Sequence, residues 1–239
     1  MGKLIVLVII EFIAISPLIF GNFDRSGDKW KNLLFFASYY CLYLFLLSVP
    51  TLFPELQFVE SNLWNWSGKT YAITGSLLFY SLFRKSFANH NFISFKQNNN
   101  SLKPKFFIVL IIFILTIGLS FLIKYSDENI SQLKFQFTMP GIDEELAFRG
   151  IMLGILSNTL RSKIHIGSII LGNPSLIITS ILFGLGHSLK IDDIYNFHQN
   201  WFEFVNMFAI GLLLGWMTIK SGSIIMAILS HNLINTDSS

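Results

Sequence analysis

Long apolar runs recur along this chain and restrict its fold more than any other feature. A helix needs about 20 mostly apolar residues to cross the hydrocarbon core of a bilayer. Clear candidates are residues 4–20, 33–53, 106–123, 165–187 and 203–219. Weaker candidates are residues 70–83, 140–159 and 223–236. Because spanning backbone must satisfy its own hydrogen bonds, we predict an all-α, polytopic transmembrane helical bundle of about eight spans.

The composition agrees with a membrane protein and excludes other classes. Hydrophobic residues make up 52% of the chain and charged residues only 13%, whereas soluble domains carry about 25% charged residues. The net charge of +3 is small and no basic tract is present, so we expect no nucleic-acid partner. The single cysteine, Cys41, cannot form an internal disulfide. We therefore expect membrane lipid as a partner.

The basic residues predict an orientation. The first apolar run follows Lys3 and lacks a small-residue cleavage site, so we interpret it as a retained helix rather than a signal peptide. The longest polar loop, residues 84–105, carries five basic residues. Loops rich in Lys and Arg stay in the cytoplasm. This rule predicts that loop 84–105 is cytoplasmic and that both termini are outside.

A carboxylate cluster, DEELAFRG at residues 143–150, follows Pro140 in one of the weaker spans. One interpretation is an acidic first turn of a helix at the membrane surface, with Pro140 at the helix start and carboxylates near the positive end of the dipole. The other interpretation is functional. Arg149 lies four residues after Glu145 on the same face, about 6 Å along the axis, so the two can pair. Glu144 then remains unpaired and faces a cavity.

Further polar residues interrupt the apolar runs. His187 ends one run, where it is either an interfacial residue or a functional one. His231 and Asn235 share a helix face, and they either join helices by hydrogen bonds or line a site. Glu11, in the first run, has no obvious partner. Ionisable residues within spans usually face an interior cavity and have a function.

The three polar motifs converge if consecutive helices alternate in direction. Glu144, His187 and His231 then approach the same leaflet. A glutamate and a histidine can activate a water molecule. A second histidine and the Asn235 amide can donate hydrogen bonds to the oxyanion that forms when this water attacks a carbonyl. The set therefore predicts a hydrolase of amide bonds, with no serine or cysteine nucleophile.

Metal binding is an alternative use of the same residues. Glu144, His187 and His231 are ligand types that zinc accepts. The HExxH pattern of soluble metalloproteases is absent from the sequence. Whether a metal binds therefore stays open at this stage, with zinc or another divalent cation as the alternative to a metal-free site.

Three short motifs resemble those of the CAAX-protease and bacteriocin-processing family of intramembrane endopeptidases. EELAFRG resembles the EExxxR motif of this family, FGLGH its FxxxH motif and HNLIN its HxxxN motif, in the same order and about 40 residues apart. The resemblance covers about residues 137–236. It divides the chain into N-terminal transmembrane helices and loops, residues 1–136, and a protease core, residues 137–239, within one integral membrane unit.

The resemblance implies a role for each motif residue. Glu144 and His187 are similar to the pair that activates water, and His231 and Asn235 to the pair that stabilises the oxyanion. Glu145 and Arg149 are similar to supporting partners within the first motif, which completes the set of six. Of the two mechanisms discussed for the family, we favour the glutamate-type mechanism, which requires no metal cofactor.

The resemblance leaves the substrate and the side of the membrane open. Some relatives cleave prenylated CAAX proteins, and others process bacteriocins or signalling peptides. The Asn-, Lys-, Ile- and Phe-rich composition suits a bacterial genome, so we expect a bacterial cell membrane. Family members are described with a cavity open to the cytosol, whereas the charge pattern places the site nearer the outer leaflet.

Two other functions compete with an endopeptidase. One is a non-catalytic membrane scaffold or sensor that regulates a partner. The other is a small proton-coupled transporter that uses Glu11, Glu144 and His187 as a relay. A scaffold has no chemical need for all six motif residues, and no inverted repeat typical of transporters is evident. Both points favour the endopeptidase.

Overall fold

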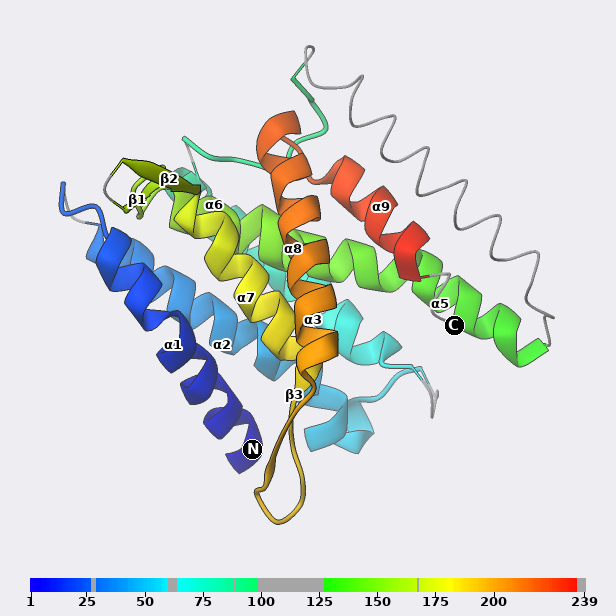
Figure 1. Cartoon of the computed structure of the whole chain (residues 1–239). Coiled ribbons are helices and arrows are strands. Elements are labelled where there is room, and N and C mark those ends of the chain that lie inside the picture. Colours follow the sequence, from blue (N-terminus) through cyan, green and yellow to red (C-terminus); the bar gives the residue numbers. More distant parts are fainter. Residues whose placement is uncertain (27–28, 60–63, 88, 99–126, 167, 236–239) are drawn as a thin grey trace.

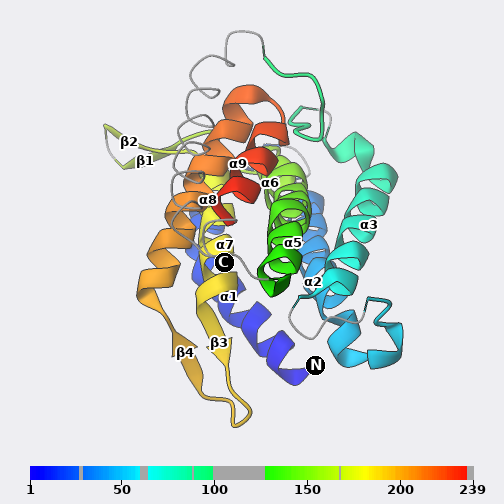
Figure 2. The same ribbon diagram turned by 90° about the vertical axis from the view of Figure 1, so that its right-hand side faces the viewer.

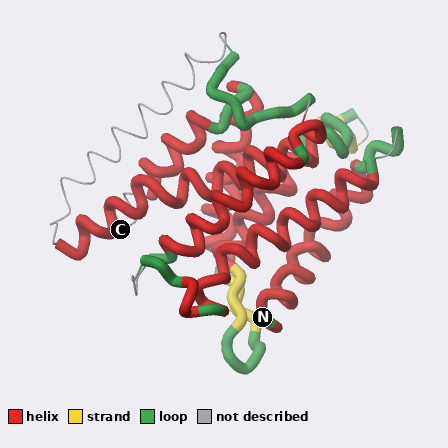
Figure 3. Tube along the Cα trace, turned by 180° about the vertical axis from the view of Figure 1, so that it is seen from behind, coloured by secondary structure: helices red, strands yellow, loops and turns green. Residues whose placement is uncertain are grey.

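The structure is a computed structural model that describes residues 1–26, 29–59, 64–87, 89–98, 127–166 and 168–235. Helices make up most of these residues (Figures 1 and 3). The α-helices are α1 (Gly2–Asn22), α2 (Trp30–Leu52), α3 (Trp66–Leu82), α5 (Asp127–Glu144), α6 (Leu153–Ser157), α7 (Pro174–Ser188), α8 (Trp201–Ser221) and α9 (Ile225–Asn235). Two 3₁₀ turns, η1 (Pro54–Leu56) and η2 (Arg84–Phe87), flank α3. The predicted all-α class is confirmed.

Three of the described helices are long and apolar enough to cross a membrane, namely α1, α2 and α8. The apolar helices α7 and α9 are shorter. The predicted span 106–123 lies outside the described residues. The structure therefore supports an integral membrane protein, but it does not confirm the predicted count of eight spans.

Two short antiparallel hairpins accompany the helices. Strand β1 (Ile164–Ile166) pairs with β2 (Ile169–Gly172), and β3 (Leu189–Ile191) pairs with β4 (Phe197–Gln199). The prediction of one helix over residues 165–187 is therefore wrong at its start. Gly172 has a φ of 130°, which ends β2, and Asn173 then caps α7 by accepting hydrogen bonds from the first turn.

Helix α5 corrects a second prediction. The sequence suggested that Pro140 starts a helix, but α5 begins at Asp127 and contains Pro140 in its interior. A proline inside a helix removes one hydrogen bond and displaces a carbonyl. A neighbouring helix compensates, because Asn232 of α9 accepts a hydrogen bond of 2.9 Å from the Gly141 N–H. The acidic residues 143–145 are therefore in the middle of a long helix, and their interpretation as an acidic first turn is wrong.

A π-helical segment, η4 (Glu145–Met152), continues α5 without a break and leads into α6. All eight of its side chains are buried. Its apolar residues, including Ile151, join a core with Phe36 of α2 and Leu182 of α7. Segments of π-helix are rare and often occur at functional sites. Here the segment fixes the two neighbouring glutamates, Glu144 and Glu145, within the packed interior.

The two ends of α8 have different neighbours. The β3–β4 hairpin precedes α8 and projects from the bundle beside the N-terminus (Figure 2). Lys3 of α1 forms an ion pair there with Asp193 at the tip of the hairpin. At the other end, the Ser221 carbonyl accepts a hydrogen bond of 2.8 Å from the Asn98 N–H. The hairpin and the described part of loop 84–105 therefore lie at opposite ends of α8.

Candidate active site

Residues from α5, α7 and α9 meet around a cavity of about 290 Å³. Glu144, His187, His231 and Asn235 all line it. Glu144 Oε2 lies 3.6 Å from His187 Nε2 and 3.7 Å from His231 Nε2. The predicted convergence of the three motif helices on one cavity is therefore confirmed, although Glu144, His187 and His231 are each separated by more than 40 positions in sequence.

The ring of His187 is oriented by its own helix. His187 Nδ1 lies 2.8 Å from the carbonyl oxygen of Phe183, one helical turn earlier. A carbonyl only accepts hydrogen bonds, so this contact places a proton on Nδ1. In the neutral ring, Nε2 then carries the lone pair and faces Glu144. His187 is therefore arranged to accept a proton within the cavity.

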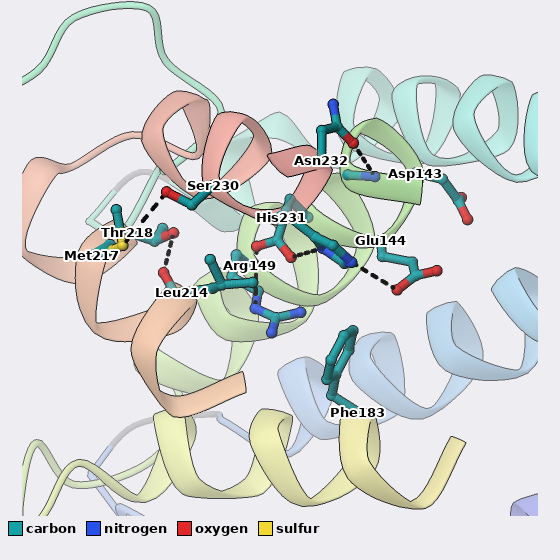
Figure 4. A network of polar contacts seen from close by, with 12 residues as sticks. Asp143, Glu144, Arg149, Phe183, Leu214, Met217, Thr218, Ser230, His231 and Asn232 are labelled. Atoms are coloured by element: carbon teal, nitrogen blue, oxygen red, sulfur yellow. Dashed lines mark hydrogen bonds and ion pairs between the residues drawn. The ribbon is translucent and has the colours of Figure 1, made fainter. Parts of the chain in front are cut away.

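Glu145, which follows Glu144 directly as the first residue of η4, is fully buried. Its Oε2 is 3.3 Å from Arg149 Nε, which confirms the predicted pair. Its Oε1 is 2.7 Å from His231 Nδ1, a contact that the sequence did not predict. The Arg149 guanidinium also lies over the Phe183 ring, 4.3 Å from its centroid. Figure 4 shows His231 reaching between the helices toward Glu144, with Phe183 on the opposite wall.

Glu144 is not unpaired, contrary to the sequence-based prediction. Lys69 of α3 places its Nζ 2.8 Å from Glu144 Oε1 and 3.0 Å from Asp143 Oδ2. Tyr43 of α2 donates a further hydrogen bond of 3.1 Å to the same oxygen of Asp143. The sequence analysis did not identify Lys69 as a residue of the site. Its position at the start of an otherwise apolar run was the signal that could have marked it as buried.

The remaining polar residues either line the cavity or form contacts between helices. Asn235 lines the cavity with His231, as their spacing predicted. The role of joining helices belongs to Asn232, which holds Gly141 of α5. Glu11 has a partner after all, because Tyr40 donates a hydrogen bond of 2.8 Å to its Oε2. Glu11 is not among the residues that line the cavity.

The expectation of a metal-free site stays a prediction. Within the described part of the chain, no group of three His, Cys, Asp or Glu residues is arranged to hold a metal ion. Lys69 occupies one oxygen of Glu144. The Glu145 carboxylate on Nδ1 of His231 does not bear on this question, because metal-bound histidines commonly make the same contact. A cation beside the central carboxylate opposes the binding of a second cation. No step below therefore depends on a metal.

A family model described as "Type II CAAX prenyl endopeptidase Rce1-like" matches residues 127–236. This part of the chain is therefore similar to the Rce1-like family. The Rce1-like match begins at the first residue of α5, ten residues before the boundary expected from the motifs. It contains all six predicted site residues but not Lys69. The Rce1-like family is a family of proteases. No curated protein and no solved structure matches the chain.

Proposed function

We propose that this protein is an intramembrane endopeptidase in which Glu144 and His187 activate a water molecule to hydrolyse a peptide bond. The observation that carries the proposal is the position of Glu144 Oε2, which lies 3.6 Å and 3.7 Å from the Nε2 atoms of His187 and His231. This oxygen is buried and accepts no hydrogen bond from any described residue. The similarity of residues 127–236 to the Rce1-like family of proteases supports the same reaction class.

The first step is the attack of water on the peptide carbonyl. The separation between Glu144 Oε2 and His187 Nε2 exceeds a direct hydrogen bond but suits a single water that contacts both atoms. The water oxygen forms a bond to the carbonyl carbon, and the C=O electron pair moves to the oxygen. The proton of the water passes to Glu144 or to Nε2 of His187, both of which can accept it.

The second requirement is stabilisation of the oxyanion. We assign this to Nε2 of His231 and the side-chain amide of Asn235. Because the Glu145 carboxylate accepts from Nδ1 of His231, that nitrogen carries a proton. Nε2 can then donate only when the ring is an imidazolium. Glu145 and Glu144 lie on two sides of the ring, 2.7 Å from Nδ1 and 3.7 Å from Nε2.

The last step is collapse of the tetrahedral intermediate. The C–N bond breaks, and the leaving nitrogen takes the proton that the water gave to Glu144 or His187. The immediate products are a carboxylic acid and an amine, and transfer of the acid's proton to the amine gives a carboxylate and an ammonium, so that atoms and charge balance without a cofactor. Arg149 does not line the cavity, and it supports the reaction by neutralising Glu145.

The substrate class follows from the walls of the cavity. Besides the polar groups, Phe135, Phe183, Met207, Ile210 and Ile234 line it. Apolar walls in an integral membrane protein suit a peptide bond close to a lipid-embedded segment or a lipid anchor. We propose a membrane-associated peptide or protein as the substrate, of the CAAX type or of the bacteriocin and signal-peptide type, in a bacterial cell membrane.

The proposal is tested by proteolysis with purified protein in lipid vesicles. The probes are an internally quenched peptide that ends in a prenylated Cys-aliphatic-aliphatic-X sequence, and an unprenylated hydrophobic peptide. Mass spectrometry identifies the products. We expect cleavage of at least one probe at a single bond. If neither probe is cleaved while the same vesicles take up protons under a pH gradient, the transporter function replaces this proposal.

A further inference from the structure

Lys69 contacts the site from α3, an element outside the family match. Asn65 caps this helix by accepting a hydrogen bond from the Gly68 N–H, and Lys69 follows directly. The first turn of a helix is unfavourable for a cation, because the helix dipole is positive there. The Lys69 side chain is nevertheless only 13% exposed. Its burial at this end of α3 therefore requires the nearby carboxylates.

The Lys69 ammonium bridges two carboxylates that are neighbours in sequence. Asp143 is completely buried and is held by Tyr43 as well as by Lys69. Glu144 contacts the same ammonium through Oε1. Breaking a buried ion pair by removing one partner is strongly destabilising, because the other charge stays buried. The Lys69 ammonium therefore compensates the negative charge of two carboxylates that are buried at adjacent positions.

The contact also fixes which oxygen of Glu144 faces the cavity. Oε1 is taken by Lys69 at 2.8 Å, whereas Oε2 lies between the two histidines. A carboxyl group free to rotate would present either oxygen. We propose that Lys69 is a positioning residue, whose ammonium, anchored by Asp143, holds Glu144 ionised with Oε2 directed at the reacting water. This inference rests on the proposed function.

The arrangement has a consequence for pH dependence. The charged and titratable groups that face Glu144 are Tyr43 from α2, Lys69 from α3, His187 from α7, His231 from α9, Asp143 on its own helix and Arg149 in η4. A base must be ionised to accept a proton. Without the ammonium, a proton binds Glu144 more readily, so the loss of activity on the acid side should occur at higher pH.

The experiment compares three variants by kcat, KM and pH profile, using whichever quenched peptide the wild-type protein cleaves. Lys69→Met removes the charge but keeps a similar length, and Lys69→Arg keeps the charge. Asp143→Asn keeps the ammonium and removes its anchor. We expect Lys69→Met to lower kcat by about 10²-fold with little change in KM, since misplacement of a reacting group by about 1 Å has this effect. In the Lys69→Met protein, the loss of activity on the acid side should occur at higher pH than in the wild-type protein. Lys69→Arg should recover most of the wild-type kcat. The kcat of Asp143→Asn should lie between those of Lys69→Met and the wild-type protein.

Each outcome decides the inference. A folded Lys69→Met protein with wild-type kcat and pH profile overturns it, and so does a change in KM alone, which would make Lys69 a substrate-binding group. If Lys69→Met does not fold, the Asp143→Asn variant tests the inference instead. A wild-type kcat in Asp143→Asn would overturn it. Failure of the wild-type protein to cleave any peptide instead overturns the proposed function.

Discussion

Two asparagines of α9, three positions apart, have different environments. Asn235 lines the cavity, whereas Asn232 accepts a hydrogen bond from the Gly141 N–H of α5. We expect Asn235→Ala to slow cleavage by about 10² to 10³-fold, the usual effect of losing one oxyanion donor. The unfolding temperature should stay close to that of the wild-type protein.

Asn232→Ala is the matched control for this prediction. It leaves the buried Gly141 N–H without its partner, which costs about 1–3 kcal/mol of stability. The folded fraction should cleave at close to the wild-type rate. Thermal unfolding in detergent and initial rates measure both properties. The reverse pattern, with a stable but inactive Asn232→Ala protein, would contradict the division of roles.

At the residue scale, helix spacing predicted a contact within one helix, but the types of the residues did not predict their contacts with other helices. The pair of Glu145 and Arg149 follows from helix periodicity, because both partners lie on one helix. Lys69 and Tyr43 were not predicted, because their contacts with Asp143 and Glu144 join segments about 75 to 100 residues apart. Neither helix periodicity nor the three motifs relates Lys69 or Tyr43 to these carboxylates. The assignment of Glu144 as unpaired was wrong for this reason.

At the scale of elements, the start of α7 determines where His187 lies. Asn173 Oδ1 accepts hydrogen bonds from the N–H groups of Ser175 and Leu176, at 2.9 and 3.3 Å. Replacing such a cap by alanine typically costs about 1 kcal/mol. We expect Asn173→Ala to lower the unfolding temperature, and Asn173→Asp, which keeps the acceptor, to preserve it. Equal destabilisation of both variants would contradict the capping role.

The elements that sequence reasoning missed depend on tertiary contacts. Apolar periodicity located all the described helices that carry the motifs. It did not predict that α5 continues through Pro140, because the compensating acceptor, Asn232, comes from another helix. It also missed the π-helical turns of η4, whose pattern of apolar residues does not differ visibly from that of an α-helix. The β1–β2 hairpin was included in a span because its residues are equally apolar.

At the scale of the whole molecule, α8 provides a test of topology. Its 21 residues extend roughly 31 Å, about the thickness of the hydrocarbon core. Lys96 and Asp193 lie near its opposite ends. In a Cys41→Ser background, we expect an impermeant maleimide to label Asp193→Cys in intact cells and Lys96→Cys only after permeabilisation. This pattern follows from the basic residues of loop 84–105.

The same labelling places the active site relative to the membrane. His187 is in the last turn of α7, next to the β3–β4 hairpin, so the site lies toward the hairpin end. The predicted pattern therefore places it near the outer leaflet. The inverted pattern would place it near the cytoplasm and contradict the charge-based orientation. Labelling of both cysteines from the same side would contradict the assignment of α8 as a span.

The central claim is that Glu144 is the base that activates water, and the rate of Glu144→Gln tests it most directly. Glutamine keeps the shape of the side chain but cannot accept the proton, so cleavage should fall by about 10² to 10⁴-fold. The control is Glu203→Gln in the first turn of α8, which should cleave at the wild-type rate. A folded Glu144→Gln protein, at equal membrane levels, that cleaves at the wild-type rate would contradict the account.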